Sequence, residues 1–290
     1  MSENTERRSL LSSVSDTVTS FFRRKKTGQK IPPKLGGCLK HPYGPFQFQI
    51  TSWEGAQYDL QASTNLVNWA SIAQGVAPGE VFDYVDSDAH KFSFRFYRLV
   101  AEGLHSANVV GFATVSTPPG FAMIANPLNA PDNRVCALLP NLPDGSTFNK
   151  FDHVKFRLSN NAFKDGKWLN PDETLVPGEG AIICNPTSEQ RVLTFVGEVM
   201  QGRLFKVIPA GFSICSSLVP QAGRLHLDLG FPVSPGDVVH IFDRDRQKYV
   251  IMEYDEKKWA ANPPLIGVGE SFWVGKTSAA NWVREFYVTL

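Results

Sequence analysis

Two glutamates stand in the same short pattern at two places in the chain. Glu179 belongs to KWLNPDETLVPGEG, residues 167–180, and Glu270 belongs to KWAANPPLIGVGES, residues 258–271. A pair of carboxylates can act as acid and base in the hydrolysis of glycosidic bonds if the two lie roughly 5 to 10 Å apart and differ in pKa. Equivalent positions in two copies of one unit would have similar surroundings. The pattern therefore favours a structural role for both glutamates, at the start of a strand.

Each copy of the pattern also contains a tryptophan. Trp168 and Trp259 each stand ten residues before the glycine of the Gly-Glu pair. A planar indole can stack on a sugar ring, but its large apolar area can equally anchor a long loop in a small β-unit. The loop anchor is the favoured interpretation. Both tryptophans are kept as candidate contacts to a ligand or partner.

The other residues that could carry chemistry form no recognisable site. The four cysteines and six histidines lack the short spacing of a metal site. The sequence contains no G-x-S-x-G, no phosphate-binding glycine loop and no dinucleotide fingerprint. We therefore expect no enzyme activity, no cofactor and no metal. We expect free thiols at the cysteines, with a disulfide as the alternative: Cys38, Cys136, Cys184 and Cys215.

Charge is unevenly distributed along the 290 residues. Residues 1–30 hold seven Lys/Arg and three acids, whereas the rest of the chain holds 22 basic and 25 acidic groups. The net charge of +1 indicates no specific affinity for nucleic acid. No apolar run is long enough to span a membrane, and the N-terminus lacks the apolar core of a secretory signal. We therefore expect a cytoplasmic protein or one exported by a non-classical route.

The N-terminal segment has the pattern of an amphipathic helix. Apolar residues recur there at helical spacing and basic residues follow them: Leu10, Val14, Val18, Phe21, Phe22, Arg23 and Arg24. Such a helix, within residues 7–26, could lie on an anionic membrane or bind in a groove of a partner. A disordered, flexible tail is the alternative, because an isolated helix of this length is marginal in water. Residues 1–40 are predicted to be this cationic tail and a Pro- and Gly-rich linker.

A period-two alternation begins at about residue 44 and predicts strands. Phe46, Phe48 and Ile50 alternate with glutamines, and similar runs follow, separated by turn-rich segments. We therefore predict an antiparallel β-module over residues 41–108.

This module has a recognisable motif. YDLQASTNLVNW, residues 58–69, followed by FYRLVA, residues 96–101, resembles short fibronectin-III/immunoglobulin-like modules of large secreted bacterial proteins. The similar stretch, residues 44–102, is shorter than a full sandwich of roughly 100 residues. The module therefore either lacks strands or uses strands of its neighbour.

The rest of the chain is a tandem repeat. Residues 111–195 match residues 202–286 without a gap at a shift of 91, with glycines and aromatic residues in phase. The match indicates a duplication. The two copies, 109–196 and 197–290, show strand patterns and no helical periodicity. We predict an all-β fold in which two similar β-units, sandwich-like or barrel-like, pack as a pseudo-twofold pair or share one barrel.

The repeat also resembles a known type of sequence. PPGFAMIANPLN, W-x-N-P-D, LVPGEG and LTFVGEV are similar to a paired β-rich repeat near the C-terminus of secreted or surface bacterial proteins, an uncharacterised family. The resemblance implies an architecture and brings no catalytic residues.

Together these features predict a non-enzymatic structural or interaction protein. We expect a protein partner or self-assembly, with the N-terminal segment as a tether. A glycan is the alternative ligand, bound by Trp168 and Trp259, and peripheral membrane contact through residues 7–26 is a further alternative.

Overall fold

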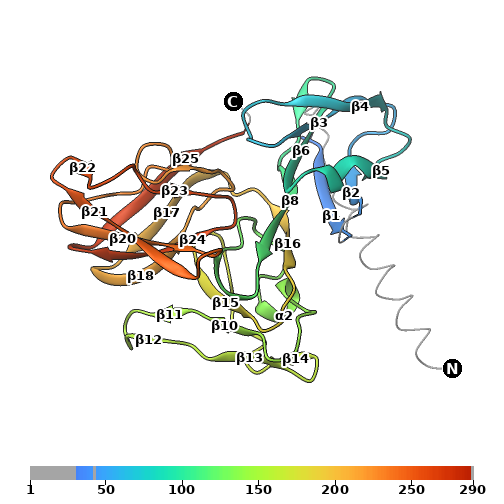
Figure 1. Ribbon diagram of the computed structural model, residues 1–290. Coiled ribbons are helices and arrows are strands. Elements are labelled where there is room, and N and C mark those ends of the chain that lie inside the picture. The colour runs from blue at the N-terminus through green and yellow to red at the C-terminus, as the bar shows by residue number, and fades with distance from the viewer. Residues whose placement is uncertain (1–30, 42–43, 289–290) are drawn as a thin grey trace. The chain divides into compact units, whose positions relative to one another are not determined.

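A computed structural model describes residues 31–41 and 44–288 of the chain. These residues are nearly all β and form several antiparallel sheets, which confirms the all-β prediction (Figure 1). The predicted N-terminal tail, residues 1–30, lies outside the described residues. Within the described part, no helix is long and apolar enough to cross a membrane.

The first module consists of two facing sets of strands. Its elements are β1 (Lys34–Lys40), β2 (Phe46–Thr51), β3 (Gln57–Ser63), β4 (Ala70–Val76), β5 (Val81–Asp86), the 3-10 helix η1 (Ser87–Lys91), β6 (Phe94–Ala101) and β7 (Leu104–His105). One sheet has the order β1-β2-β5, and the other begins β4-β3-β6. The alternating residues Phe46, Phe48 and Ile50 are fully buried, as their period predicts. Stacked rings such as Phe46 and Tyr97, 5.0 Å apart, fill the core between the sheets.

The module completes its second sheet with strands from the following unit. Strand β6 pairs with β8 (Val110–Thr117), which in turn pairs with β16 (Arg191–Glu198). Phe112 of β8 is fully buried in the core of the module. The structure thus decides between the two alternatives for this short module, because it uses strands of its neighbour.

One predicted boundary is wrong. Residues 34–40, assigned to the linker, form strand β1 and pair with β2. Leu35 is fully buried and fixes this strand in the core. The Gly36-Gly37 pair that looked like linker punctuation lies at an irregularity of the ladder, where Gly37 has a φ of +55°.

The next unit forms a five-stranded sheet. Besides β8 and β16, its elements are β9 (Gly120–Ile124), α2 (Val135–Leu138), β10 (Thr147–Asn149), β11 (Phe151–Asp152), β12 (Arg157–Leu158), β13 (Asn161–Lys164), β14 (Lys167–Trp168) and β15 (Ala181–Asn185). The strand order is β14-β13-β10-β15-β9, and β11 and β12 form a separate hairpin.

The last unit has the same arrangement of strands. Its elements are β17 (Gly202–Ile208), β18 (Gly211–Ser216), β19 (Gly223–Arg224), β20 (Asp237–Asp243), β21 (Lys248–Asp255), β22 (Lys258–Trp259), β23 (Leu265–Ile266), β24 (Ser271–Lys276) and β25 (Ala280–Phe286). The order β22-β21-β20-β24-β18 follows that of the preceding sheet. The registers agree as well at the shift of 91, since Ala181 faces Ile124 and Phe272 faces Cys215.

The outer strand pair is the exception. Gly111 faces Gly197 in the β8·β16 pair, but Gly202 faces Phe286, where the shift of 91 would place residue 288. The register of β17·β25 therefore differs by two residues. In addition, β8 continues into the sheet of the module, whereas β17 and β25 form a two-stranded sheet of their own.

Candidate functional site

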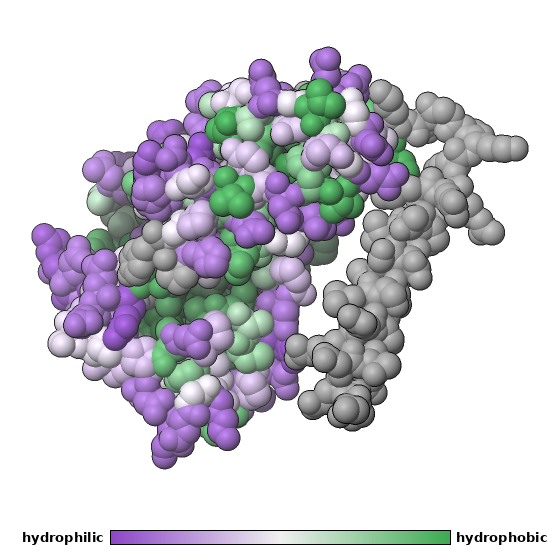
Figure 2. Space-filling model, turned by 90° about the vertical axis from the view of Figure 1, so that its right-hand side faces the viewer, coloured by the Kyte–Doolittle hydropathy of each residue, from purple (hydrophilic) through white to green (hydrophobic). Residues whose placement is uncertain are grey.

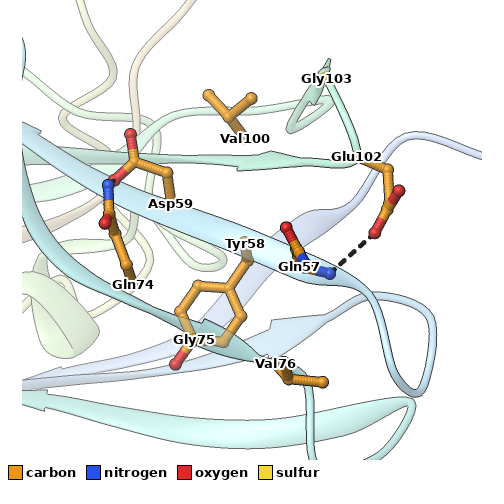
Figure 3. A pocket seen from close by; sticks show the side chains of 9 residues that line it. All are labelled: Gln57, Tyr58, Asp59, Gln74, Gly75, Val76, Val100, Glu102 and Gly103. Atoms are coloured by element: carbon orange, nitrogen blue, oxygen red, sulfur yellow. Dashed lines mark hydrogen bonds between the residues drawn. The ribbon is translucent and has the colours of Figure 1, made fainter.

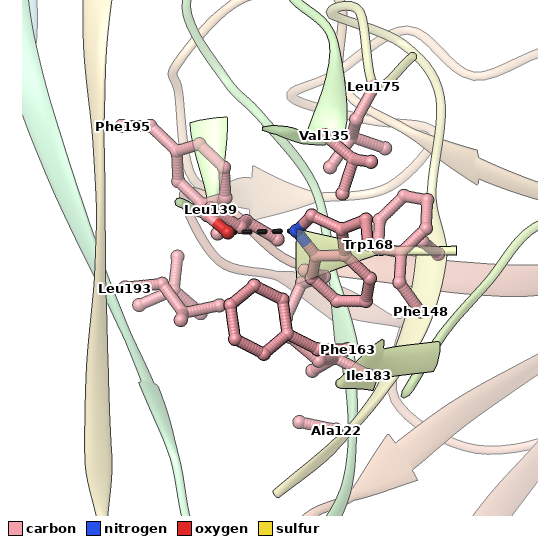
Figure 4. Close-up of a cluster of buried hydrophobic side chains, with 13 residues drawn as sticks. Ala122, Val135, Leu139, Phe148, Phe163, Trp168, Leu175, Ile183, Leu193 and Phe195 are labelled. Atoms are coloured by element: carbon pink, nitrogen blue, oxygen red, sulfur yellow. Dashed lines mark hydrogen bonds between the residues drawn. The ribbon is translucent and has the colours of Figure 1, made fainter. Parts of the chain in front are cut away.

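The two predicted tryptophan sites are in the core. Trp168 is 3% exposed, and its Nε1 donates to the carbonyl oxygen of Leu139 at 2.9 Å (Figure 4). Its ring packs edge-on against Phe163. Trp259 is 4% exposed, and its Nε1 donates to Nδ1 of His226 at 2.9 Å. Both indoles are buried in the core, so in this structure neither presents a face on which a sugar could stack.

The two glutamates close the turns in which they stand. The Glu179 carboxylate accepts the Val176 N–H at 3.0 Å and forms an ion pair with Lys150 at 2.8 Å. The Glu270 carboxylate accepts the Gly267 N–H at 2.9 Å and pairs with Arg244. Both carboxylates are occupied by a cation and a backbone donor, which is a structural use.

The glycines beside these glutamates connect the two units. The carbonyl oxygen of Gly178 accepts the N–H of Ser216 at 3.1 Å, and that of Gly269 accepts the N–H of Ala125 at 2.8 Å. Ser216 and Ala125 are themselves 91 residues apart, so the two contacts are equivalent. A Cβ on Gly269 would lie 2.4 Å from Cγ2 of Val115. The repeated sequence pattern is therefore the place where the two units interlock.

Hairpin tips make a second pair of equivalent contacts. The side-chain amide of Gln247 accepts the Phe121 N–H at 2.7 Å and donates to the Phe121 carbonyl oxygen at 2.8 Å. The equivalent residues, Phe156 and Phe212, meet by their rings, with centroids 6.4 Å apart. Phe156 and Gln247 have nearly the same left-handed φ, 50° and 51°. One tip therefore contacts strand β9 through the amide of Gln247, and the other contacts strand β18 through the ring of Phe156.

A continuous group of rings lies on the surface where the units meet. We call it the seam surface, and it consists of the rings of Phe151, Phe156, Phe212, His240, Tyr249 and Trp273 together with Ile251, which faces His240 across the β20·β21 ladder. The ring of Phe151 packs on that of Trp273 with a centroid distance of 4.8 Å, and the ring of Phe212 on that of His240 with a centroid distance of 6.0 Å. The Trp273 Nε1 donates to the Tyr249 hydroxyl at 3.2 Å. Phe156 and Ile251 are 66% and 62% exposed.

The sequence analysis missed the seam surface. Its members come from positions far apart in the sequence, and the hairpin that carries Phe151 and Phe156 reaches them only in the folded chain. One signal was present: Tyr249, Val250 and Ile251 are consecutive apolar residues of strand β21, and all three are exposed.

A groove in the first module is lined by residues of β3, β4 and the end of β6 with the turn after it (Figure 3). It has a volume of about 610 Å³. On its wall, Asp59 accepts hydrogen bonds from Ser71, Gln61 and Gln74. Partial burial would raise the pKa of Asp59, but these hydrogen bonds outweigh it and hold the pKa below its usual value. Asp59 therefore stays ionised and ties β3 to β4.

The four cysteines are free thiols. None forms a disulfide. Burial, with a smaller effect of Glu198, raises the pKa of Cys38 to about 12, and burial also raises the pKa of the Cys215 thiol. A thiolate nucleophile is therefore not available at either position. Within residues 31–41 and 44–288, no three His, Cys, Asp or Glu side chains are placed to hold a metal ion.

The predicted contact residues of the N-terminal segment, Leu10 to Arg24, lie outside the described residues. No protein-family model matches the chain, and no curated protein is similar to it in sequence.

Proposed function

We propose that the protein is a non-enzymatic interaction protein that binds a protein partner through the seam surface. The exposed, contiguous rings of this surface carry the proposal, because soluble proteins rarely expose large apolar patches that have no function. Aromatic residues are also the residue type enriched in the centre of protein interfaces. Apolar side chains gather elsewhere too, as in the hollow on the face drawn in Figure 2.

The contacts between the units support a rigid surface. The seam surface takes Phe151 and Phe156 from one unit and the other residues from the next, so its shape depends on the two Gly-Glu turns that join the units. A preorganised surface loses little entropy on binding. The same arrangement is what a duplicated β-unit of a bacterial surface protein would need, and we include this origin, with a fibronectin-III-like first module, in the proposal.

A site-specific photo-crosslinker tests the seam surface. A photoreactive phenylalanine analogue at position 251 should crosslink a discrete protein in the source cells. The matched control is position 67, an exposed valine in the first module. Equal crosslinking from both positions, or none from position 251, would refute the proposed role.

The N-terminal segment is proposed as a tether. Its basic amphipathic sequence supports binding to an anionic membrane or to a partner's groove. Deleting residues 1–30 should abolish co-sedimentation with anionic vesicles or capture of the partner, while leaving the thermal unfolding of the β-units unchanged. If both binding measurements are unaffected by the deletion, the segment has no tethering role.

A further inference from the structure

Strand β17 has an open edge where its equivalent is occupied. In the preceding unit, β8 pairs on one edge with β16 and on the other with β6, where Phe94 faces Ala113 and Tyr97 faces Val110. Strand β17 stands at the position of β8 but, in the part of the chain that the structure describes, pairs only with β25. Among the described residues, no backbone N–H of Gly202–Ile208 reaches an acceptor outside the β17·β25 ladder. The edge that receives β6 in one unit is thus free in the other.

The alternation of the ladder shows which groups point outward. The N–H of Thr114 in β8 points away from β16 and donates to the Ser93 carbonyl oxygen at 2.7 Å. Phe205 is the residue equivalent to Thr114 at the shift of 91. The two-residue change in register keeps the alternation, because neighbouring residues in an antiparallel pair alternate in direction. The N–H and C=O groups of residues 203, 205 and 207 therefore point to the free edge.

The face beside this edge is apolar and uncovered. Phe205 is 69% exposed, and Val207 and Val283 are also exposed. On the same face of the β8·β16 pair, Phe112 and Val110 are buried in the core of the first module. An open edge next to an exposed apolar face is the arrangement that promotes pairing with another strand.

We propose that the edge of β17 pairs with β17 of a second copy of this chain. The inference rests on the proposed role as an interaction protein and names a second surface and its partner. Strand β6 of a second copy is not available, because β3 and β8 already occupy both its edges. An isologous antiparallel pair centred on Phe205 places residue 205 opposite residue 205, and residue 203 opposite residue 207. In this register, the outward N–H groups of residues 203, 205 and 207 face the outward C=O groups of the other copy.

The charges allow this pairing. Strand β17 contains no proline and carries two cations, Arg203 and Lys206. In this register neither stands opposite a charge, because residue 203 faces residue 207 and residue 206 faces residue 204. Within each chain, Glu285 of β25 faces Arg203. A strand of 7 residues is short compared with the roughly 20 to 30 residues that each partner contributes to a standard interface. We therefore expect a weak dimer whose fraction rises with concentration.

Sedimentation velocity over a concentration series tests the pairing. The full-length chain should change from monomer to dimer, and F205K should remain monomeric, because it places two like charges opposite each other at the centre. The control is I251K, which replaces a similarly exposed residue on the seam surface. Thermal unfolding should show that both variants are folded. A monomer at all concentrations, or loss of the dimer in I251K but not in F205K, would overturn the proposal.

Disulfide trapping tests whether residue 205 faces residue 205 of the other copy in the dimer. Residues in a hydrogen-bonded antiparallel pair have Cα atoms about 5.5 Å apart, within the range of about 4.4 to 6.8 Å that a disulfide needs. Under mild oxidation, F205C should form a covalent dimer, whereas I251C and the unmodified chain should not. Equal trapping of F205C and I251C would overturn the pairing at β17. If position 251 crosslinks a partner but no β17 dimer forms, the seam surface is supported and the β17 pairing is refuted. If a β17 dimer forms but position 251 crosslinks no partner, the β17 pairing is supported and the seam surface is refuted.

Discussion

An ion pair is buried in the core of the last unit. Lys276 and Asp237 both have fully buried side chains, and Asp237 also accepts the N–H groups of Ser234 and Thr277. Replacing Lys276 by Met leaves an unpaired charge in the core. Removing one partner of such a pair costs about 3 to 5 kcal/mol. We expect K276M to lose stability of this size in urea unfolding, and K276M combined with D237N to recover part of it. No loss in K276M would contradict the assigned role of the pair.

Two glycine-to-alanine variants distinguish the stability contributed by the contact between the units from the cost of backbone strain. Gly269 and Gly202 both have positive φ, 78° and 103°. A Cβ on Gly269 collides with Val115 of the other unit, whereas a Cβ on Gly202 meets nothing within 4 Å. Both alanine variants carry strain of roughly 1 kcal/mol or more, and only G269A adds an overpacking cost of typically 1 to 3 kcal/mol. Similar stability of the two variants in urea unfolding would argue against the interlock.

At the scale of elements, the two tryptophan anchors differ in one respect. Trp168 donates to a backbone carbonyl, which does not titrate, but Trp259 donates to Nδ1 of His226. A protonated imidazole cannot accept this hydrogen bond. Burial, with a contribution from Arg224, lowers the pKa of His226 below its usual value. The unfolded chain therefore binds the proton more readily than the folded one, and stability falls as the pH drops below about 6.5.

The variant H226Q tests this dependence, because the glutamine oxygen can accept from the indole but does not titrate. Denaturant unfolding at pH 7.5 and pH 5.5 should show a smaller loss of stability in H226Q than in the unmodified chain. The pKa values of His105 and His240 are also lowered, mainly by burial, so a residual pH dependence is expected in both proteins. If H226Q and the unmodified chain lose the same stability between the two pH values, His226 does not cause the pH dependence.

At the scale of the whole molecule, the first module and the following unit share one sheet. A chain truncated to begin at residue 109 would expose the edge of β8 and the side chains of Phe112 and Val110, which the module buries. We expect this chain to aggregate or to unfold at a lower temperature than the full chain. Light scattering and calorimetry check it. A soluble truncated chain with unchanged unfolding would show that the shared sheet contributes little to stability.

The sequence predicted what depends on local periodicity. Alternation marked Phe46 and Phe48 as core residues, and the 91-residue repeat anticipated matching positions such as Trp168 and Trp259. It could not predict contacts between distant segments. Strand β1 was missed because two glycines of a bulge look like a linker, and the seam surface was missed because no local pattern brings Phe151 to Trp273.

The shared strand β8 also constrains how such a protein can be inherited. A recombination event that moved residues 34–108 alone into another gene would deliver a sheet lacking its last two strands and a core lacking Phe112. Loss of residues 34–108 from the original gene would leave strand β8 without the module that covers it. The first module and the unit that follows it should therefore be inherited together, and the last unit with them, because the two Gly-Glu turns join it to the preceding unit by equivalent hydrogen bonds.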